Sequence, residues 1–168
     1  MVKGQRSARR GPGGAVSTKV EIAAPAAAVW EVLADPSRWP ERTASMTSVE
    51  LLDGGPLGPD AQVRIRQPKL PVMVWRVVAW RPGESFVWTA SSRGVRTVAT
   101  HSVVPVGERH SRLLLGVFHH GPLAPLVRLL TGRLTRRYVA MEAAGHKAAA
   151  EESVASGGAP PTPTPGQG

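Results

Sequence analysis

Three polar side chains could carry chemistry inside an otherwise apolar interior. His101 and His119 lie in segments where apolar and polar residues alternate, and Tyr138 lies in a segment with a helical apolar period. An imidazole exchanges protons near neutral pH, and a phenol can donate a hydrogen bond to a carbonyl oxygen. The same groups could equally make structural hydrogen bonds. Their residue types therefore allow acid–base chemistry or ligand contact without requiring either.

The other histidines show no spacing that a metal site needs. His119 and His120 are adjacent in a predicted strand and point to opposite faces, which disfavours a two-ligand site. His110 falls in a turn and His146 near the end of a helix, so neither is expected to be a metal ligand. The chain has no cysteine, which excludes thiol nucleophiles and zinc–thiolate sites. We predict no metal and no cofactor.

Other catalytic signatures are absent too. The sequence contains no nucleophile elbow, zinc-protease motif, Walker loop or dinucleotide fingerprint. The acids are scattered without the paired spacing that acid–base catalysis uses, and solvated faces and turns explain them. They include Glu21, Glu31, Glu41, Glu50 and Glu84. If the protein is an enzyme, its chemistry must come from isolated polar groups in an apolar cavity.

The hydrophobic period predicts the elements that position these groups. A strand ends at Pro25, a helix with one apolar face follows, and a turn-rich piece around Pro36 and Pro40 comes next. Period two then dominates, with turn residues between short runs, which predicts antiparallel pairing. The predicted strands are Met46–Leu52, Ala61–Gln67, Val72–Trp80, Ser85–Ser91, Val95–Val104 and Arg112–His119. After Gly121-Pro122, a long helix carries an apolar stripe and covers one face of the sheet.

Strand parity and this stripe predict which side chains face the interior. A curved sheet under a long helix leaves room for a small-molecule pocket, and aromatic walls with few polar groups suit a planar apolar molecule. Ordinary core packing is the alternative for the aliphatic members. The predicted ligand-binding residues are Trp75, Val77, Phe86, Trp88, Thr97, Ala99, His101, Leu115, Val117, His119, Leu126, Leu130, Leu134 and Tyr138. Parity reverses beyond any β-bulge. Trp30, Trp39 and Trp80 are assigned to packing or to the surface.

Length and composition favour a single domain. The 168 residues suffice for one core. We expect a disordered basic head (1–16), a folded domain (17–151) and a disordered Gly/Pro-rich tail (152–168). Without a signal-peptide-length or membrane-spanning apolar run, a cytoplasmic location is expected. The net charge of +9 could attract anionic partners. A GC-rich codon bias, which raises the number of arginines, explains the charge without selection for nucleic-acid binding.

Specific stretches resemble the START-like (SRPBCC) superfamily, in particular its bacterial polyketide cyclase/dehydrase-like subfamily. These are VEIAAPAAAVWEVLADPSRWPE, VELLDGGPLGPDAQVRIRQP and GPLAPLVRLLTGRLTRRYVAMEAAGHKAAAE. The resemblance implies an α+β helix-grip fold: strand, two helices, six strands and a long helix, with a curved antiparallel sheet of about seven strands around the C-terminal helix. It narrows the fold more than the function.

Three functions remain open from the sequence. The first is binding of a small hydrophobic molecule such as a lipid, polyketide or other apolar metabolite. The second is a cyclase or aromatase using the same cavity, with His101 or His119 as acid or base and Tyr138 polarising a carbonyl. The third is docking on RNA, a membrane surface or an acidic partner. It would use the basic helix face of Arg128, Arg133, Arg136 and Arg137, for which a solvated exterior is the simpler explanation.

Overall fold

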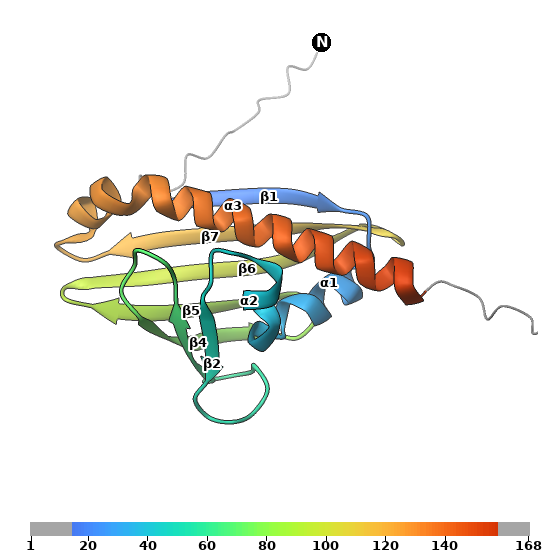
Figure 1. The fold of residues 1–168 in the computed structure, drawn as a ribbon, viewed down its shortest axis with the longest axis horizontal. Helices are drawn as coiled ribbons and strands as arrows, with labels where there is room; N and C mark the ends of the chain where they lie inside the picture. The colour runs from blue at the N-terminus through green and yellow to red at the C-terminus, as the bar shows by residue number, and fades with distance from the viewer. Residues whose placement is uncertain (1–14, 158–168) are drawn as a thin grey trace, which may run out of the picture.

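The computed structural model describes residues 15–157 and places eleven elements along them. Figure 1 shows a single sheet with one long helix lying across it. The elements are β1 (Val16–Ile22), α1 (Ala26–Leu33), η1 (Pro36–Arg38), α2 (Trp39–Arg42), β2 (Ser48–Leu51), β3 (Gln62–Arg66), β4 (Met73–Arg81), β5 (Ser85–Ser92), β6 (Val95–Gly107), β7 (His110–His120) and α3 (Ala124–Gly157). Each predicted strand is present, and its ends differ from the prediction by a few residues.

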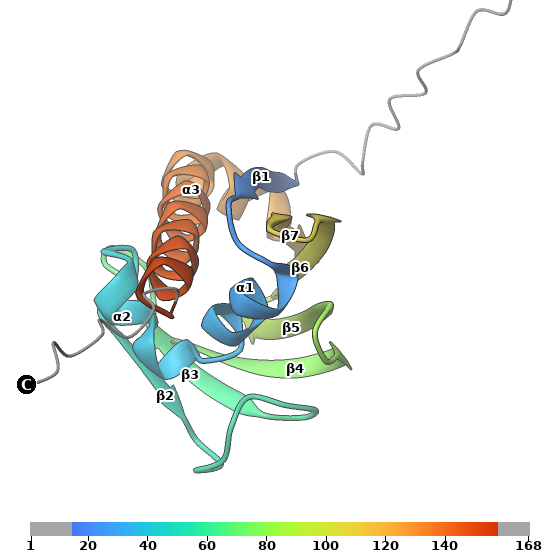
Figure 2. The same ribbon diagram turned by 90° about the vertical axis from the view of Figure 1, so that its right-hand side faces the viewer.

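All seven strands pair antiparallel in one sheet. Their spatial order is β1-β7-β6-β5-β4-β3-β2, so β1 joins the last strand and every other neighbour is consecutive in sequence. Figure 2 shows the sheet curving around α3 and α1, which lie on its concave side. This is the helix-grip α+β fold that the sequence predicts. Among the described residues, no helix is both long enough and apolar enough to cross a membrane.

The concave face of the sheet carries the hydrophobic core, as strand parity predicts. Val63 and Ile65 on β3 are buried, whereas Arg64 between them is exposed and forms an ion pair with Glu50 on the neighbouring strand β2. Buried side chains from the central strands and α1 complete the same cluster. They include Phe86, Trp88, Leu113, Leu115, Val29 and Leu33. Alternation therefore separates an apolar inner face from a polar outer face on each of these strands.

A β-bulge in β4 changes the predicted side of Trp80. The register shifts between Val77 and Ala79, so parity reverses beyond that point. Trp80 therefore packs against the core, with its ring 5.2 Å from that of Trp30 and 5.8 Å from that of Phe86. Strict alternation would group Trp80 with Arg76 on the outer face, whereas the structure shows packing, one of the two placements that the sequence left open for Trp80.

The face of α3 that packs on the sheet differs from the predicted stripe. Leu126 and Leu130 of this stripe are 51% and 73% exposed, whereas Tyr138, also in the stripe, is buried on a face that it shares with Glu142 and His146. Each residue turns the helix by about 100°, so a step of four residues advances about 40° around the axis. From Leu126 to Tyr138 the stripe therefore rotates by about 120°, which carries its first members away from the sheet.

Both predicted domain boundaries shift slightly. β1 begins at Val16, one residue before the predicted start, and α3 continues to Gly157. Residues 152–155 contain no helix breaker, so the last turns continue up to the Gly157-Gly158 pair. Residues 152–157 are thus helical rather than part of the predicted tail. The rest of the predicted head and tail (1–14 and 158–168) lies outside the described residues.

Gly145→Ala is expected to destabilise the fold. A Cβ at Gly145 would lie 2.4 Å from the carbonyl oxygen of Arg42, where α3 crosses the end of α2. Overpacking against backbone costs about 1–3 kcal/mol, more than the gain in helix propensity. Urea unfolding measures the change. Gly132→Ala, in the same helix but with only the end of the Arg136 side chain nearby, should be neutral or stabilising. Equal stability of the two variants would contradict the close α2–α3 contact.

Candidate functional site

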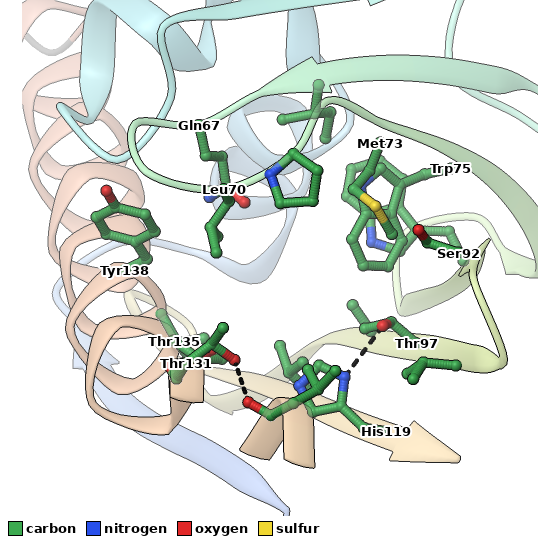
Figure 3. A pocket seen from close by; sticks show the side chains of 18 of the residues that line it. Gln67, Leu70, Met73, Trp75, Ser92, Thr97, His119, Thr131, Thr135 and Tyr138 are labelled. Carbon is green, nitrogen blue, oxygen red and sulfur yellow. Dashed lines mark hydrogen bonds between the residues drawn. The ribbon is translucent and has the colours of Figure 1, made fainter. Parts of the chain in front are cut away.

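A cavity of about 370 Å³ lies between the concave face of the sheet and α3. Side chains from the β3–β4 loop, β4, β7 and α3 surround it (Figure 3). Its wall includes exposed residues such as Arg93, Leu126 and Leu130, so the cavity opens to solvent beside the first turns of α3. Buried His101 and Glu142 also line it. The space therefore runs from an exposed mouth to a buried polar end.

Eleven of the fourteen predicted site residues line this cavity. They are Trp75, Trp88, Thr97, Ala99, His101, Leu115, Val117, His119, Leu126, Leu130 and Tyr138. The other three lie elsewhere. Val77 and Phe86 are fully enclosed in the core, and Leu134 is partly buried on α3 outside the lining. Phe86 still supports the site, because its ring stacks on that of His101 at 4.2 Å and 10°.

Sequence reasoning missed a second set of lining residues. The β3–β4 loop contributes Gln67, Leu70 and Pro71, although its Gln-Pro-Lys-Leu-Pro sequence indicates only a turn. Further members come from the segment before β2, from the sheet and its β5–β6 turn, and from α3. They are Met46, Ile65, Met73, Ser92, Arg93, Thr131, Thr135 and Glu142. Alternation identifies the face of a strand, but it does not show how far a loop folds back over that face.

The walls of the cavity are mainly apolar and partly aromatic. Trp75 and Trp88 are neighbours, with ring centroids 5.5 Å apart and planes inclined by 36°. Aliphatic side chains of the β3–β4 loop and α3 lie around the remainder. Offset aromatic surfaces favour flat apolar molecules.

His101 and Glu142 form a buried polar pair at the cavity. His101 Nε2 lies 3.2 Å from Glu142 Oε1, joining β6 to α3. His101 is 3% exposed and Glu142 is 9% exposed. A carboxylate removed from water needs such a partner, because an unpaired buried charge is very unfavourable.

His146 and Trp39 lie next to this pair. His146 is fully buried, with Nε2 3.6 Å from Glu142 Oε1, and the Trp39 ring packs edge-on against it at 4.9 Å. His146 therefore lies beside the buried polar pair, although it is not one of the residues that line the cavity. Position near the C-terminal part of a helix does not decide burial, because α3 packs on α1 and β1 along this stretch. Among the described residues, Trp39 Nε1, His146 Nδ1 and His101 Nδ1 have no hydrogen-bond partner.

The charges of this cluster follow from its contacts. Burial by itself raises the pKa of Glu142, but the hydrogen bond from His101 and the contact with His146 outweigh it and lower that pKa to about 2. Burial lowers the pKa of His101, and the Glu142 carboxylate only partly opposes this shift. Glu142 is therefore ionised and His101 neutral at neutral pH. Since an ionised carboxylate only accepts hydrogen bonds, His101 Nε2 carries the proton and Nδ1 is the basic nitrogen.

The other two predicted polar groups have different partners. His119 Nδ1 lies 3.0 Å from Thr97 Oγ1, and burial together with the Arg128 charge lowers the pKa of His119. Tyr138 donates its hydroxyl proton to the carbonyl oxygen of Pro68 at 2.6 Å. That proton is committed to the backbone, which opposes the predicted role of Tyr138 in polarising a carbonyl. Of the three predicted polar groups, His101 is the one that pairs with an acid at the cavity.

Tyr138→Phe should loosen the β3–β4 loop over the cavity. Removing the hydroxyl leaves the Pro68 carbonyl without this donor and should cost about 1 kcal/mol of unfolding free energy. Hydrogen exchange should accelerate in residues 67–71, whereas exchange in β6 stays unchanged. Unchanged exchange in the loop would show that this hydrogen bond does not hold it.

Comparisons with known proteins agree with this architecture. The family described as "Polyketide cyclase / dehydrase and lipid transport" matches residues 14–151. The ZhuI aromatase/cyclase from Streptomyces sp. R1128 superposes with a TM-score of 0.72 at 19% identity, covering 86% of this chain and 97% of that one. A START superfamily protein from Mycobacterium smegmatis gives 0.61 at 22% identity, covering 81% and 98%.

A protein from Thermus thermophilus gives a TM-score of 0.63 at 18% identity, covering 86% of this chain and 99% of that one. No curated protein matches the chain in sequence. At these identities the structural likenesses establish the fold. The family match, by contrast, spans nearly the whole described chain. The helix-grip sheet, the cavity under α3 and this match together show that the chain belongs to the polyketide cyclase/dehydrase and lipid transport family of START-like proteins.

Proposed function

We propose that the protein binds one small, largely apolar and flat molecule in the cavity between the sheet and α3. The observation that carries this proposal is the cavity itself, about 370 Å³ in volume, open at one end and lined mainly by apolar side chains. That volume lies within the usual range for small-molecule sites. Protein interiors pack densely and rarely leave voids larger than a water molecule, so an open space of this volume indicates a binding site.

The buried end of the cavity suggests what the ligand carries. A ligand hydroxyl or phenol could donate to the Glu142 carboxylate, while the rest of the molecule lies against Trp75 and Trp88. Because polar lining groups are few, one or two oxygen atoms on an apolar skeleton fit better than a sugar or nucleotide. Lipids with a hydroxyl and aromatic polyketides both meet this description.

Titration with N-phenyl-1-naphthylamine, a neutral apolar fluorophore, tests the proposal. Saturable enhancement of its emission at one probe per chain is expected, with quenching of tryptophan emission because Trp75 and Trp88 line the cavity. An apolar competitor should displace the probe, and the melting temperature should rise with probe concentration. Linear, unsaturable enhancement without any thermal shift would sink the proposal.

A second candidate function is acid–base catalysis at the same cavity. The His101–Glu142 pair supports it, because an ionised carboxylate on Nε2 leaves Nδ1 as the basic nitrogen of a residue that lines the cavity. Nδ1 is buried and has no hydrogen-bond partner among the described residues, so a reacting ligand must displace the side chains that cover it. The reaction class is loss of water from a β-hydroxyketone. Nδ1 would remove a proton from the carbon between carbonyl and carbinol, and that proton would leave with the hydroxide as water. The described aromatase/cyclase neighbour has the same fold.

An aromatic β-hydroxyketone tests this candidate, because its dehydration gives a conjugated enone that absorbs in the near ultraviolet. His101→Ala should abolish enone formation, whereas His119→Ala, which removes an imidazole bonded to Thr97 and not to an acid in the described part of the chain, should retain it. Equal turnover by wild type and His101→Ala would remove the catalytic candidate. It would leave ligand binding, measured with the fluorophore, intact.

A further inference from the structure

The mouth of the cavity carries exposed leucines. Leu123, Leu126, Leu129 and Leu130 come from the start of α3 and its approach, and they are 46%, 51%, 81% and 73% exposed. Leu123, Leu126 and Leu130 line the cavity as well, so this surface and the mouth are continuous. Large exposed apolar groups gathered at one place usually mark a contact surface.

Cations surround these leucines. Lys69, Arg93, Arg133, Arg136 and Arg137 are exposed, and none forms an ion pair within the part of the chain that the structure describes. Several arginines elsewhere are paired. Arg64 pairs with Glu50, Arg76 with Asp60 and Arg112 with Glu21. These five cations are thus available to contact another molecule.

The sequence keeps acids away from this end. Between Asp60 and Glu142 the chain has only two, Glu84 and Glu108. They lie in the β4–β5 and β6–β7 turns, whereas the mouth is formed by the β3–β4 loop, the β5–β6 turn and the start of α3. β5 alone separates the two ends by about 25 Å at about 3.3 Å per residue. Glu142 is buried, so the chain between Asp60 and Glu142 places no exposed acid at the mouth.

Leucines and arginines share the outward face of α3. Leu126, Leu130, Arg133 and Arg137 fall within about 60° of one another around the helix axis at about 100° per residue. The first two turns of this face are leucine-rich, and the next is arginine-rich. An apolar segment beside exposed cations matches the surface of a bilayer, where acyl chains lie next to anionic headgroups.

We propose that this mouth surface (Leu123, Leu126, Leu129, Leu130, Lys69, Arg93, Arg133, Arg136 and Arg137) docks on a bilayer containing anionic lipids. The leucines insert among the lipids and the cations contact headgroup phosphates. Docking stands on the surface alone. Its consequence, that the cavity opens toward lipid and exchanges its ligand there, rests on the proposed function.

Other occupants fit the surface less well. A second copy would place like charges against each other, which disfavours a two-fold dimer through this face. The chain's own N-terminal residues carry Lys3, Arg6, Arg9 and Arg10 without an acid and would be repelled. RNA phosphates could pair with the arginines, but binding RNA would leave the four leucines without an apolar partner.

Sedimentation with vesicles tests docking. The full chain should pellet with phosphatidylcholine vesicles that contain phosphatidylglycerol and stay in solution with phosphatidylcholine alone, and added salt should weaken binding. Leu129→Ser, outside the cavity lining, should lower the partition coefficient about tenfold, since a leucine is no longer transferred out of water. Arg133→Glu/Arg137→Glu should lower it at least as much, because two attractions become repulsions.

Matched variants away from the mouth serve as controls. Lys19→Glu/Arg81→Glu makes the same charge change, and Val106→Ser removes an exposed apolar group that is 52% accessible. Both should bind like wild type or lose much less. Equal loss in these controls would overturn the docking surface, as would binding to homopolymeric RNA that Leu129→Ser leaves unchanged, or leucine-dependent dimerisation in light scattering. Fluorophore binding, unaffected in Leu129→Ser, separates this outcome from failure of the cavity proposal.

Discussion

Thr131→Trp is expected to weaken binding of the naphthylamine fluorophore by about a hundredfold or more while the fold persists. Thr131 lines the cavity from α3, and its hydroxyl donates to the Val127 carbonyl in the same helix. An indole at this position would enter the 370 Å³ space and take the place of a ligand ring. A ligand excluded from the cavity loses the burial that drives binding, and burying a few ring carbons amounts to several kcal/mol.

Ala144→Trp is the matched control for this variant. Ala144 lies on the exposed side of the same helix, so the added indole is the same but points to solvent. Equilibrium titration should give wild-type affinity for Ala144→Trp and almost no saturable binding for Thr131→Trp, with both variants cooperatively folded in urea. If Thr131→Trp binds as tightly as Ala144→Trp, the ligand does not use this cavity.

Glu142→Gln is expected to cost about 2–3 kcal/mol of unfolding free energy near neutral pH, the largest stability loss foreseen for a near-isosteric change. A folded pKa of about 2 against an ordinary 4.5 corresponds to roughly 3 kcal/mol of stability. Because the folded pKa is depressed, this contribution is complete above about pH 4.5 and is lost as the pH falls toward about 2. Glutamine lacks the charge, so it lacks this contribution at every pH.

Urea unfolding near pH 7 and near pH 3 measures the effect. The gap between wild type and Glu142→Gln should shrink markedly at the lower pH. His101 adds a slope of the same sign: burial lowers its pKa, so acidification below its ordinary value of 6.5 favours the unfolded state in both proteins. Glu152→Gln, exposed on the same helix, should leave stability nearly unchanged. An equal gap at both pH values would mean that Glu142 is not an ionised buried carboxylate.

The sheet could be predicted closely because alternation is a local signal with a single meaning. Val63, Arg64 and Ile65 alternate between buried and exposed, as their apolar and polar types predict, and turn residues end each strand. Trp80 is the exception, since nothing in the local pattern marks the bulge after Val77. One extra residue reverses the side of every later side chain in the strand.

The polar end of the cavity could not be predicted as well. Tyr138, Glu142 and His146 follow one another at four-residue steps, a spacing that places polar residues near one helix face. This spacing alone does not indicate burial, because a glutamate in an alanine-rich helix is most often solvent-exposed. Its burial depends on His101, forty-one residues away in sequence on β6, and on Trp39, which covers His146. Such tertiary pairing leaves no local trace.

Native mass spectrometry most directly tests whether the cavity between sheet and helix holds a small apolar molecule. Wild-type protein mixed with an apolar extract of its expression host should show a defined one-to-one mass excess that disappears on denaturation. Thr131→Trp should show only the mass of the bare chain. Identical spectra for the two proteins, with or without bound mass, would contradict a ligand site in this cavity.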